Sequence, residues 1–423
     1  MTPKERARTI LVSGGALVLV ALLLWAFVRA FPYKGEVPEG APWLETHELA
    51  PLTLTTTTLE LKGREEVLRI PEGLKMNVAA EGLGKARFMA MSSDGRLFVP
   101  DMVDYKLSHQ GKLYVLGGFN PATGTFAEKN VYLSGLRGPN SVLLYTDPDG
   151  QEWLYLALTA HLIRYKYEPG DLRPSGPGEI LVEFPNTQTP GETSVVWHIT
   201  RTIHERDGRI YIAVGSGCNA CEQVEGDMRG MIYSILPDGS DARVYAHNIR
   251  NGVDFTWDDT GMMYATANGV DHLGSDTPDE VMYQVPEGIT FGWPYCYESG
   301  GKILPDTSRD WRNPINCEDA PRSFASFAPR SAPLGIEYFS KSFNELLAGS
   351  FLVALHGSFE VTMGTGNQLI RVAPDGTQAV FMEGFLTADG RRIIRAVDFL
   401  PYSENAFFMS DDEGGRIFYL QAS

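Results

Sequence analysis

Short apolar runs separated by tight turns recur along most of the chain. The clearest pair surrounds Asp207-Gly208, with Arg201–Ile203 leading into the turn and Arg209–Val214 leading out. Asp-Gly between two such runs predicts a β-hairpin, because both central residues of a type I′ turn adopt positive φ. His198 stands just before the first run, so this hairpin carries an ionisable residue at its mouth.

The same hairpin pattern occurs six times, mostly at a spacing of roughly 53 to 58 residues, which is typical of propeller blades. The paired runs are 88–91 with 96–99, 141–145 with 153–156, 201–203 with 209–214, 253–257 with 262–265, 335–339 with 350–353, and 396–400 with 407–410. Further short runs between the pairs leave room for four strands in each repeat. The pattern therefore predicts an all-β fold, a six-bladed β-propeller over residues 53–423. The longest interval holds Gly288–Arg330, which we expect to form an insertion on one face.

The start of the chain has a different pattern. Three basic residues precede Ile10–Val28, a run of nineteen residues without a charge. This predicts an N-terminal transmembrane helix within residues 1–31, whose basic flank stays in the cytoplasm. A linker over residues 32–52 would then hold the propeller in the periplasm, anchored to the cytoplasmic membrane. The alternative is a signal peptide that is cleaved near Ala30.

Charge and cysteine content narrow the functional classes. The chain has 36 basic and 53 acidic residues, a net charge of −17, whereas nucleic-acid binding needs a basic surface. Four cysteines lie in the part expected outside the cytoplasm, where an even number is typical of disulfides. We expect the pairs Cys218–Cys221 and Cys296–Cys317. A zinc site of four cysteines is the alternative.

Polar residues gather at three places near the ends of predicted inner strands. These are His198, the segments 247–252 and 268–271 with the acidic residues that follow, and the segment 356–358 with Arg391, Arg392 and Arg395. The ends of inner strands converge on the central channel of a propeller. Together the three groups suit a general base, an anionic ligand and a divalent cation. Taken singly, each has a structural explanation, since a His before a strand caps or packs and Asp-Gly clusters form turns.

Several short segments from residue 198 onwards carry a resemblance to a known family. They are His198-Ile199-Thr200-Arg201, Asp207-Gly208-Arg209-Ile210-Tyr211, Gly215-Ser216-Gly217, Ile249-Arg250-Asn251, Asp279-Glu280, Phe291-Gly292-Trp293-Pro294-Tyr295, Ala332-Pro333-Leu334-Gly335 and His356-Gly357-Ser358. In their order and spacing, the chain resembles the quinoprotein glucose/sorbosone dehydrogenases, which are six-bladed propellers that use pyrroloquinoline quinone (PQQ) and calcium. The blades before residue 198 match only in their hairpins.

The resemblance implies roles for individual residues. His198 would be the general base that takes the proton of a substrate hydroxyl while hydride passes to the quinone. Arg250, Asn251 and Asn268 would hold the cofactor, with Arg395 contributing from the last blade.

Four further roles follow from the same resemblance. His356 is the candidate for a lysine that contacts the cofactor in glucose-oxidising members. The main-chain carbonyls of Gly269 and Val270 would bind Ca²⁺, which polarises the quinone as a Lewis acid. Trp293 would border the sugar site. The implied partners are a small sugar, the membrane, and a quinone or cytochrome that accepts the electrons.

Two segments depart from the family pattern. Ser216 stands where glucose-oxidising members carry an Asp that orients the base, and Phe359-Glu360-Val361 replaces the Trp-Asn-Arg of sorbosone-type relatives. Three functions therefore stay open. The leading hypothesis is a membrane-anchored, periplasmic, PQQ-dependent dehydrogenase of an aldose or related sugar. The alternatives are a non-catalytic propeller that serves as an interaction subunit of a membrane assembly, and a calcium-dependent propeller lactonase.

Overall fold

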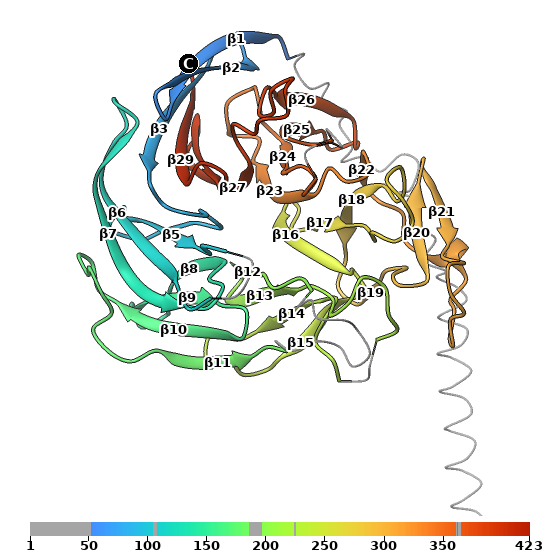
Figure 1. The fold of residues 1–423 in the computed structure, drawn as a ribbon. Coiled ribbons are helices and arrows are strands. Elements are labelled where there is room, and N and C mark those ends of the chain that lie inside the picture. Colours follow the sequence, from blue (N-terminus) through green and yellow to red (C-terminus); the bar gives the residue numbers. More distant parts are fainter. Residues whose placement is uncertain (1–51, 105–107, 186–196, 224–225, 361, 363–364) are drawn as a thin grey trace, which may run out of the picture. The chain divides into compact units, whose positions relative to one another are not determined.

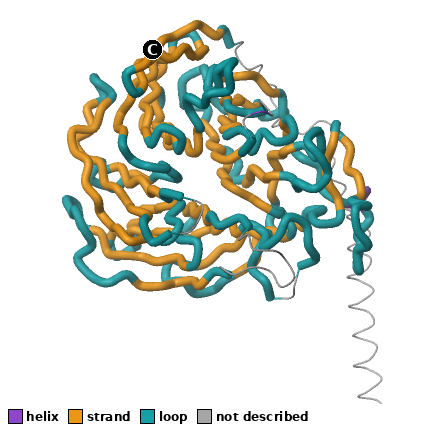
Figure 2. The backbone as a smooth tube through the Cα atoms, viewed as in Figure 1, coloured by secondary structure: helices purple, strands orange, loops and turns teal. Residues whose placement is uncertain are grey.

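Six sheets are arranged around a common axis (Figure 1). This computed structural model describes residues 52–104, 108–185, 197–223, 226–360, 362 and 365–423. Strands and loops make up nearly all of them, and η1 (Cys317–Asp319) is a short 3₁₀ helix (Figure 2). Among these residues, no helix has the length and apolar character needed to cross a membrane. The predicted transmembrane helix lies outside the described residues.

The first three blades follow one another along the chain, each as an antiparallel sheet with its innermost strand first. The first contains β4 (Ala90–Met91), β5 (Leu97–Asp101), β6 (Gly111–Asn120) and β7 (Thr125–Leu136). The second contains β8 (Ser141–Thr146), β9 (Glu152–Ala157), β10 (His161–Tyr167) and β11 (Glu179–Glu183). The third contains β12 (Arg201–Arg206), β13 (Arg209–Val214), β14 (Met231–Ile235) and β15 (Arg243–His247), and β19 (Ile289–Thr290) adds a parallel outer strand.

The other three blades complete the ring. The fourth contains β16 (Asn251–Trp257), β17 (Met263–Asn268), β18 (Glu280–Val285) and β22 (Ala325–Phe327). The fifth contains β23 (Pro333–Phe339), β24 (Ser350–Leu355), β25 (Gln368–Val372) and β26 (Gln378–Met382). The sixth contains β27 (Ala396–Ser403), β28 (Ala406–Asp411), β29 (Arg416–Ala422) and β3 (Leu74–Glu81), so strands from both ends of the propeller sequence form it.

The paired runs of the sequence are the first two strands of each blade, which confirms the six repeats. In the third blade Arg206 pairs with Arg209, and Asp207 and Gly208 have φ of 52° and 74°. These values are those of the predicted type I′ turn. Before the first blade, β1 (Leu54–Leu61) pairs with β2 (Arg64–Pro71).

Apolar side chains are buried between neighbouring sheets, not in a single core. Between the sixth and first blades, for example, Phe408 and Tyr419 pack with Leu97 and Leu116. Similar clusters lie between each other pair of adjacent blades. Alternating residues of one strand therefore face two different interfaces, which is why strands buried on both faces contain nearly continuous apolar runs.

The predicted insertion contributes both to the sheets and to a face. Part of it completes blades, because β19 and β22 belong to the third and fourth sheets. The rest contains the hairpin of β20 (Cys296–Ser299) and β21 (Lys302–Pro305), followed by η1. Cys296 is joined to Cys317 here, and Cys218 is joined to Cys221, so both predicted disulfides are confirmed. The alternative of a four-cysteine zinc site is wrong.

Candidate functional site

The six inner strands all begin on the same face of the propeller, and hydrogen bonds link the six blades there in a closed ring. The successive links are Arg87–Asn140, Asn140–Arg201, Ser216–Arg250, Asn268–Pro333, His356–Arg395 and Asp412–Arg87. Six of the predicted site residues lie in this ring or directly beside it, namely His198, Arg250, Asn251, Asn268, His356 and Arg395. The structure thus brings together side chains that are spread over nearly two hundred residues of sequence.

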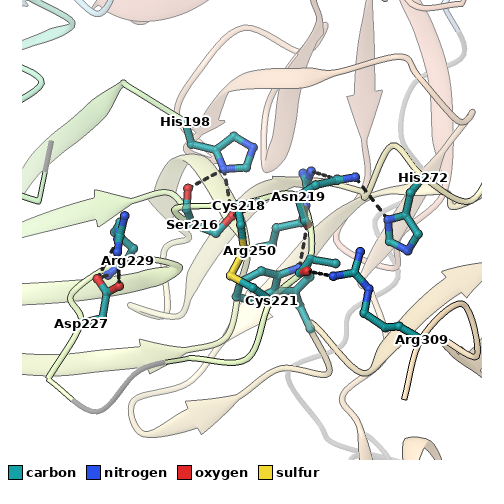
Figure 3. Close-up of a disulfide and its surroundings, with 12 residues drawn as sticks. His198, Ser216, Cys218, Asn219, Cys221, Asp227, Arg229, Arg250, His272 and Arg309 are labelled. Carbon is teal, nitrogen blue, oxygen red and sulfur yellow. Dashed lines mark hydrogen bonds and ion pairs between the residues drawn. A yellow bond between two sulfur atoms is a disulfide. The ribbon is translucent and has the colours of Figure 1, made fainter. Parts of the chain in front are cut away.

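His198 is held in one orientation by the chain around it. Its backbone has a φ of 45°, and its carbonyl oxygen accepts a hydrogen bond of 2.7 Å from Arg201. Its Nδ1 lies 2.9 Å from both the carbonyl and the hydroxyl oxygen of Ser216 (Figure 3). The Ser216 hydroxyl in turn donates to the carbonyl oxygen of Cys218 at 2.7 Å. Ser216 is therefore the orienting group that the sequence comparison left unassigned.

These hydrogen bonds define the tautomer of His198. A carbonyl oxygen only accepts, and the Ser216 hydroxyl proton is directed to Cys218, so Nδ1 must carry the ring proton. Nε2 then has a free lone pair. Burial and the positive charges of Arg250 and Arg201 lower the pKa of His198 well below its usual value, against the opposing effect of the Ser216 carbonyl. The ring is neutral at neutral pH and can accept a proton at Nε2.

Arg250 lies beside this base with its guanidinium buried. Its donors reach the main-chain and side-chain oxygens of Asn219 at 2.9 and 2.8 Å, the carbonyl oxygen of Asn268 at 2.8 Å, and the Asp271 carboxylate at 3.4 Å. Burial lowers the pKa of Arg250 to about 10, so the group stays charged at neutral pH. Most of its N–H groups are thus bonded to the protein, and its positive charge is what it offers to a ligand.

Asn251 and Asn268 connect this arginine to the next blade. The Asn251 amide nitrogen donates to the side-chain oxygen of Asn268 at 2.9 Å, and Asn268 donates to the carbonyl of Pro333 at 3.2 Å. Gly215 lies between Asn251 and His198, because a Cβ built there would be 2.5 Å from an atom of each. Only a residue without a side chain lets the base and the amide come this close.

Arg395 and His356 form the opposite part of the ring. The Arg395 guanidinium donates to the carbonyl oxygens of His356 and Gly357 at 3.3 and 3.1 Å. The side chain is 7% exposed, and no carboxylate of the described residues forms an ion pair with it. A buried guanidinium without a carboxylate partner is costly, and an anionic ligand would remove that cost.

His356 is paired and not free. Its Nε2 donates to Asp412 at 2.9 Å, and Asp412 also accepts from Arg87 at 3.1 Å. Burial lowers the pKa of His356. Although burial acts to raise it, the pKa of Asp412 is lowered by His356, Arg87 and Arg395. His356 therefore stands as a neutral donor to an ionised carboxylate, which differs from the cationic lysine whose place it was expected to take.

The predicted calcium ligands meet a different cation. The Gly269 N–H donates to Glu280 at 2.7 Å, and the carbonyl oxygen of Val270 lies 3.5 Å from Nη1 of Arg330. Arg330 also donates to the carboxylate and carbonyl of Asp271 and to the carbonyl of Gly274. The described part of the chain contains no group of three His, Cys, Asp or Glu side chains arranged to hold a metal ion. A guanidinium thus contacts oxygens on one side of this loop, and calcium binding by the carbonyls of Gly269 and Val270 stays a prediction.

Trp293 is buried, with 6% of its surface exposed. Its indole N–H donates to the carbonyl oxygen of Asn219 at 3.2 Å, and it packs with Cys218, Ala220 and Val270. The structure therefore places Trp293 against the Cys218–Cys221 loop. A contact with sugar stays a prediction.

Three solved structures share this architecture. The PQQ domain of pyranose dehydrogenase from Coprinopsis cinerea, in its holo form, matches with a TM-score of 0.66 at 18% identity, over 84% of this chain and 97% of that one. A Trichoderma reesei protein of Carbohydrate-Active Enzymes Family AA12 matches with a TM-score of 0.67 at 17% identity, over 88% of this chain and 100% of that one. The PQQ-bound form of aldose sugar dehydrogenase from Streptomyces coelicolor matches with a TM-score of 0.55 at 18% identity, over 83% and 99%.

The chain shares their fold. Its sequence matches no protein-family model and no curated protein. At these identities the likeness concerns the fold alone, and the roles of single residues depend on the geometry described above.

Proposed function

We propose that the protein is an exported PQQ-dependent dehydrogenase that oxidises an aldose or a related sugar. The observation that carries this proposal is the fixed tautomer of His198. The imidazole is neutral, its Nε2 lone pair is free to accept a proton, and buried arginines lie beside it. A base poised in this way suits removal of a hydroxyl proton. The shared fold with PQQ-containing sugar dehydrogenases supports the choice of substrate class and cofactor.

The ring offers the charges that PQQ requires. PQQ carries three carboxylates, and Arg395 is a buried guanidinium that forms no close ion pair in the described chain, although it interacts electrostatically with Asp412. Arg250 contributes a second buried positive charge, and the Asn251 amide lies close to the base across Gly215. When bound, the quinone supplies the acceptor for a hydride. Arg395 and Arg250 would hold its carboxylates, and the chain would keep the substrate hydroxyl near His198.

The proton step belongs to His198. Its Nε2 takes the hydroxyl proton as the C–H bond of the sugar breaks, and the resulting imidazolium still donates from Nδ1 to Ser216. Ser216 thus keeps the ring in the same orientation before and after the transfer. No proton step is assigned to calcium, and Arg330 contacts the loop that was predicted to bind it.

The location of the enzyme follows from its cysteines. Two disulfides are typical of proteins outside the cytosol. We include in the proposal that residues 1–31 anchor the propeller to the outer side of the cytoplasmic membrane, where a quinone or a cytochrome would take up the electrons.

The test is a titration of the purified protein with PQQ, followed by the absorbance of the cofactor. We expect saturable binding at one site and bleaching when aldoses are added. His198→Gln should bind PQQ with unchanged affinity and lose at least about a thousandfold of the oxidation rate. Absence of binding in large PQQ excess would contradict the proposal and favour the non-catalytic propeller. Hydrolysis of a lactone without PQQ would favour the lactonase.

A further inference from the structure

A loop of four residues, closed by the Cys218–Cys221 disulfide, contacts both the buried Arg250 and Ser216, the residue that orients the base (Figure 3). The carbonyl of Cys218 accepts from Ser216, which orients His198, at 2.7 Å. The carbonyl of Asn219 accepts from Arg250 at 2.9 Å. Consecutive carbonyls of one loop therefore bind Arg250 directly and His198 through the Ser216 hydroxyl.

The side chain of Asn219 adds a second contact to Arg250. Its oxygen accepts from Nη2 of Arg250 at 2.8 Å and from the main-chain N–H of Asp271 at 2.9 Å. Its nitrogen lies 3.2 Å from Nδ1 of His272, whose Nε2 lies 2.9 Å from the carboxylate of Asp306. The carboxylate accepts, so Nε2 of His272 carries the proton and Nδ1 accepts from Asn219. The His272–Asp306 pair thus turns the amide oxygen of Asn219 toward Arg250.

Packing against neighbouring side chains also holds the loop in place. Cys218 and Ala220 are fully buried and pack with Val270 and Trp293 below them. The disulfide spans only three positions of sequence, against 21 for Cys296–Cys317. Closing so short a loop restricts the unfolded chain less than closing a long one. The effect expected of Cys218–Cys221 is therefore local, on the placement of the carbonyls between its ends.

We propose that the disulfide-closed loop 218–221, with Asn219 at its centre, is the positioning element that sets His198 and Arg250 relative to one another. The inference rests on the proposed function, because it assigns the loop a part in the same site. Neither the disulfide nor Asn219 takes part in the chemistry. Opening the disulfide releases the Cys218 carbonyl from Ser216, whose hydroxyl can then rotate, and it loosens the grip of Asn219 on Arg250.

The first test reads His198 directly, in the full-length protein labelled with ¹⁵N-histidine. In the wild type we expect the Nδ1–H tautomer of His198 and a titration well below pH 6.5. The charged groups that face its ring are Arg250 and Arg201. In Cys218→Ser/Cys221→Ser we expect mixed tautomers and a titration shifted toward the ordinary range. The matched control, Cys296→Ser/Cys317→Ser, opens the other disulfide and should leave the His198 signals unchanged.

Activity gives the second readout. Cys218→Ser/Cys221→Ser should lose roughly tenfold to a hundredfold in kcat, because a small misplacement of a base has effects of that size. Asn219→Ala should weaken PQQ binding about tenfold, because Arg250 loses the side-chain oxygen that holds it. If the serine variant does not fold, reduction of the folded Cys296→Ser/Cys317→Ser variant with a phosphine opens Cys218–Cys221 alone and provides the same comparison.

The outcomes separate this inference from the proposed function. A wild type that binds no PQQ overturns the dehydrogenase, while the His198 signals still report whether the loop positions the ring. An active wild type whose serine variant keeps the His198 tautomer, its titration and kcat would overturn the inference alone. Equal shifts of the His198 signals in both double variants would overturn it as well.

Discussion

Ser216 accepts the Nδ1 proton of His198 through two oxygens, its carbonyl and its hydroxyl, each at 2.9 Å. The main-chain carbonyl cannot be removed by substitution, whereas the hydroxyl can. Ser216→Ala should therefore weaken the hold on the ring without abolishing it, with a fall in kcat of roughly tenfold and little change in KM. Steady-state kinetics with the best aldose checks this, and an unchanged kcat would show that the carbonyl alone suffices.

A second substitution of Ser216 tests the effect of a negative charge next to His198. Ser216→Asp puts a carboxylate next to Nδ1 of His198, which favours the imidazolium and raises its pKa. The buried carbonyl of Cys218 loses its donor at the same time. The acid limb of the kcat/KM profile should move to higher pH, and the variant should unfold at a lower temperature than the wild type. An acid limb that stays in place would argue against direct contact between the two side chains.

The pH dependence of the wild type follows from the sign of the His198 shift. The base works when it is neutral, and burial together with Arg250 lowers its pKa below the usual 6.5. Activity should therefore persist below pH 6.5 and be lost only as pH falls through the lowered value. Arg250→Gln removes the nearby positive charge, so the His198 titration followed by NMR should move upward. Arg209→Gln, on the hairpin end away from the ring, should leave that titration unchanged.

Substitution of Arg395 should weaken cofactor binding without lowering the stability of the cofactor-free protein. Arg395→Met removes a buried charge that has no carboxylate partner among the described residues. We expect PQQ affinity to fall by about thirtyfold or more, which corresponds to about 2 kcal/mol, with an unchanged or higher melting temperature of the cofactor-free protein. Arg87→Met is the control, because it breaks a buried ion pair with Asp412 and should lower that temperature. A large loss of stability in Arg395→Met would show that the arginine already has its partner.

The raised pKa of Glu280 makes the stability of the folded protein depend on pH. Burial raises its pKa from 4.5 to about 7, so the folded state holds a proton that the unfolded state has released between these values. Stability from this group is fully present below pH 4.5 and is lost as pH rises through 7, by at most about 3 kcal/mol. Glu280→Gln keeps an acceptor for the Gly269 N–H and should flatten this dependence. Urea unfolding of both proteins at pH 5 and pH 8 checks this. An equal change in the free energy of unfolding between the two pH values in both proteins would contradict it.

Arg330 makes the response to calcium testable. Its guanidinium contacts oxygens of Val270, Asp271 and Gly274, as a hard cation would. EDTA should therefore leave the melting temperature of the wild type unchanged. Arg330→Met frees those oxygens and should acquire a stabilisation that depends on calcium. A wild type that loses stability in EDTA and regains it with calcium would contradict this prediction and show that the loop binds the ion.

The repeats were predictable because they depend on short-range chemistry. An Asp-Gly turn between apolar runs is readable from neighbouring residues, and its spacing gave the number of blades. The sequence also placed His198, Arg250 and Arg395 near the ends of inner strands, where the structure has them, and their roles stay predictions. Their meeting in one ring is a property of the fold.

What could not be predicted depends on contacts between distant segments. Nothing near Val270 indicates that Arg330, sixty residues later, would face its carbonyl. Ser216 was visible as a departure from a family pattern, yet its role depends on where the Cys218 carbonyl lies. Asn219 lies inside the C-x-x-C segment, and that signal was interpreted only as a disulfide.

The sixth blade has a consequence for how the protein is made. Its outer strand, β3, precedes the other five blades in the sequence, while β29, to which it bonds, is the last strand of the chain. The chain leaves the ribosome, or crosses a membrane, from its N-terminus. The edge of β3 that binds β29 therefore stays unpaired until the rest of the chain has emerged. Loss of even the last ten residues would therefore leave an open ring instead of a slightly shorter one.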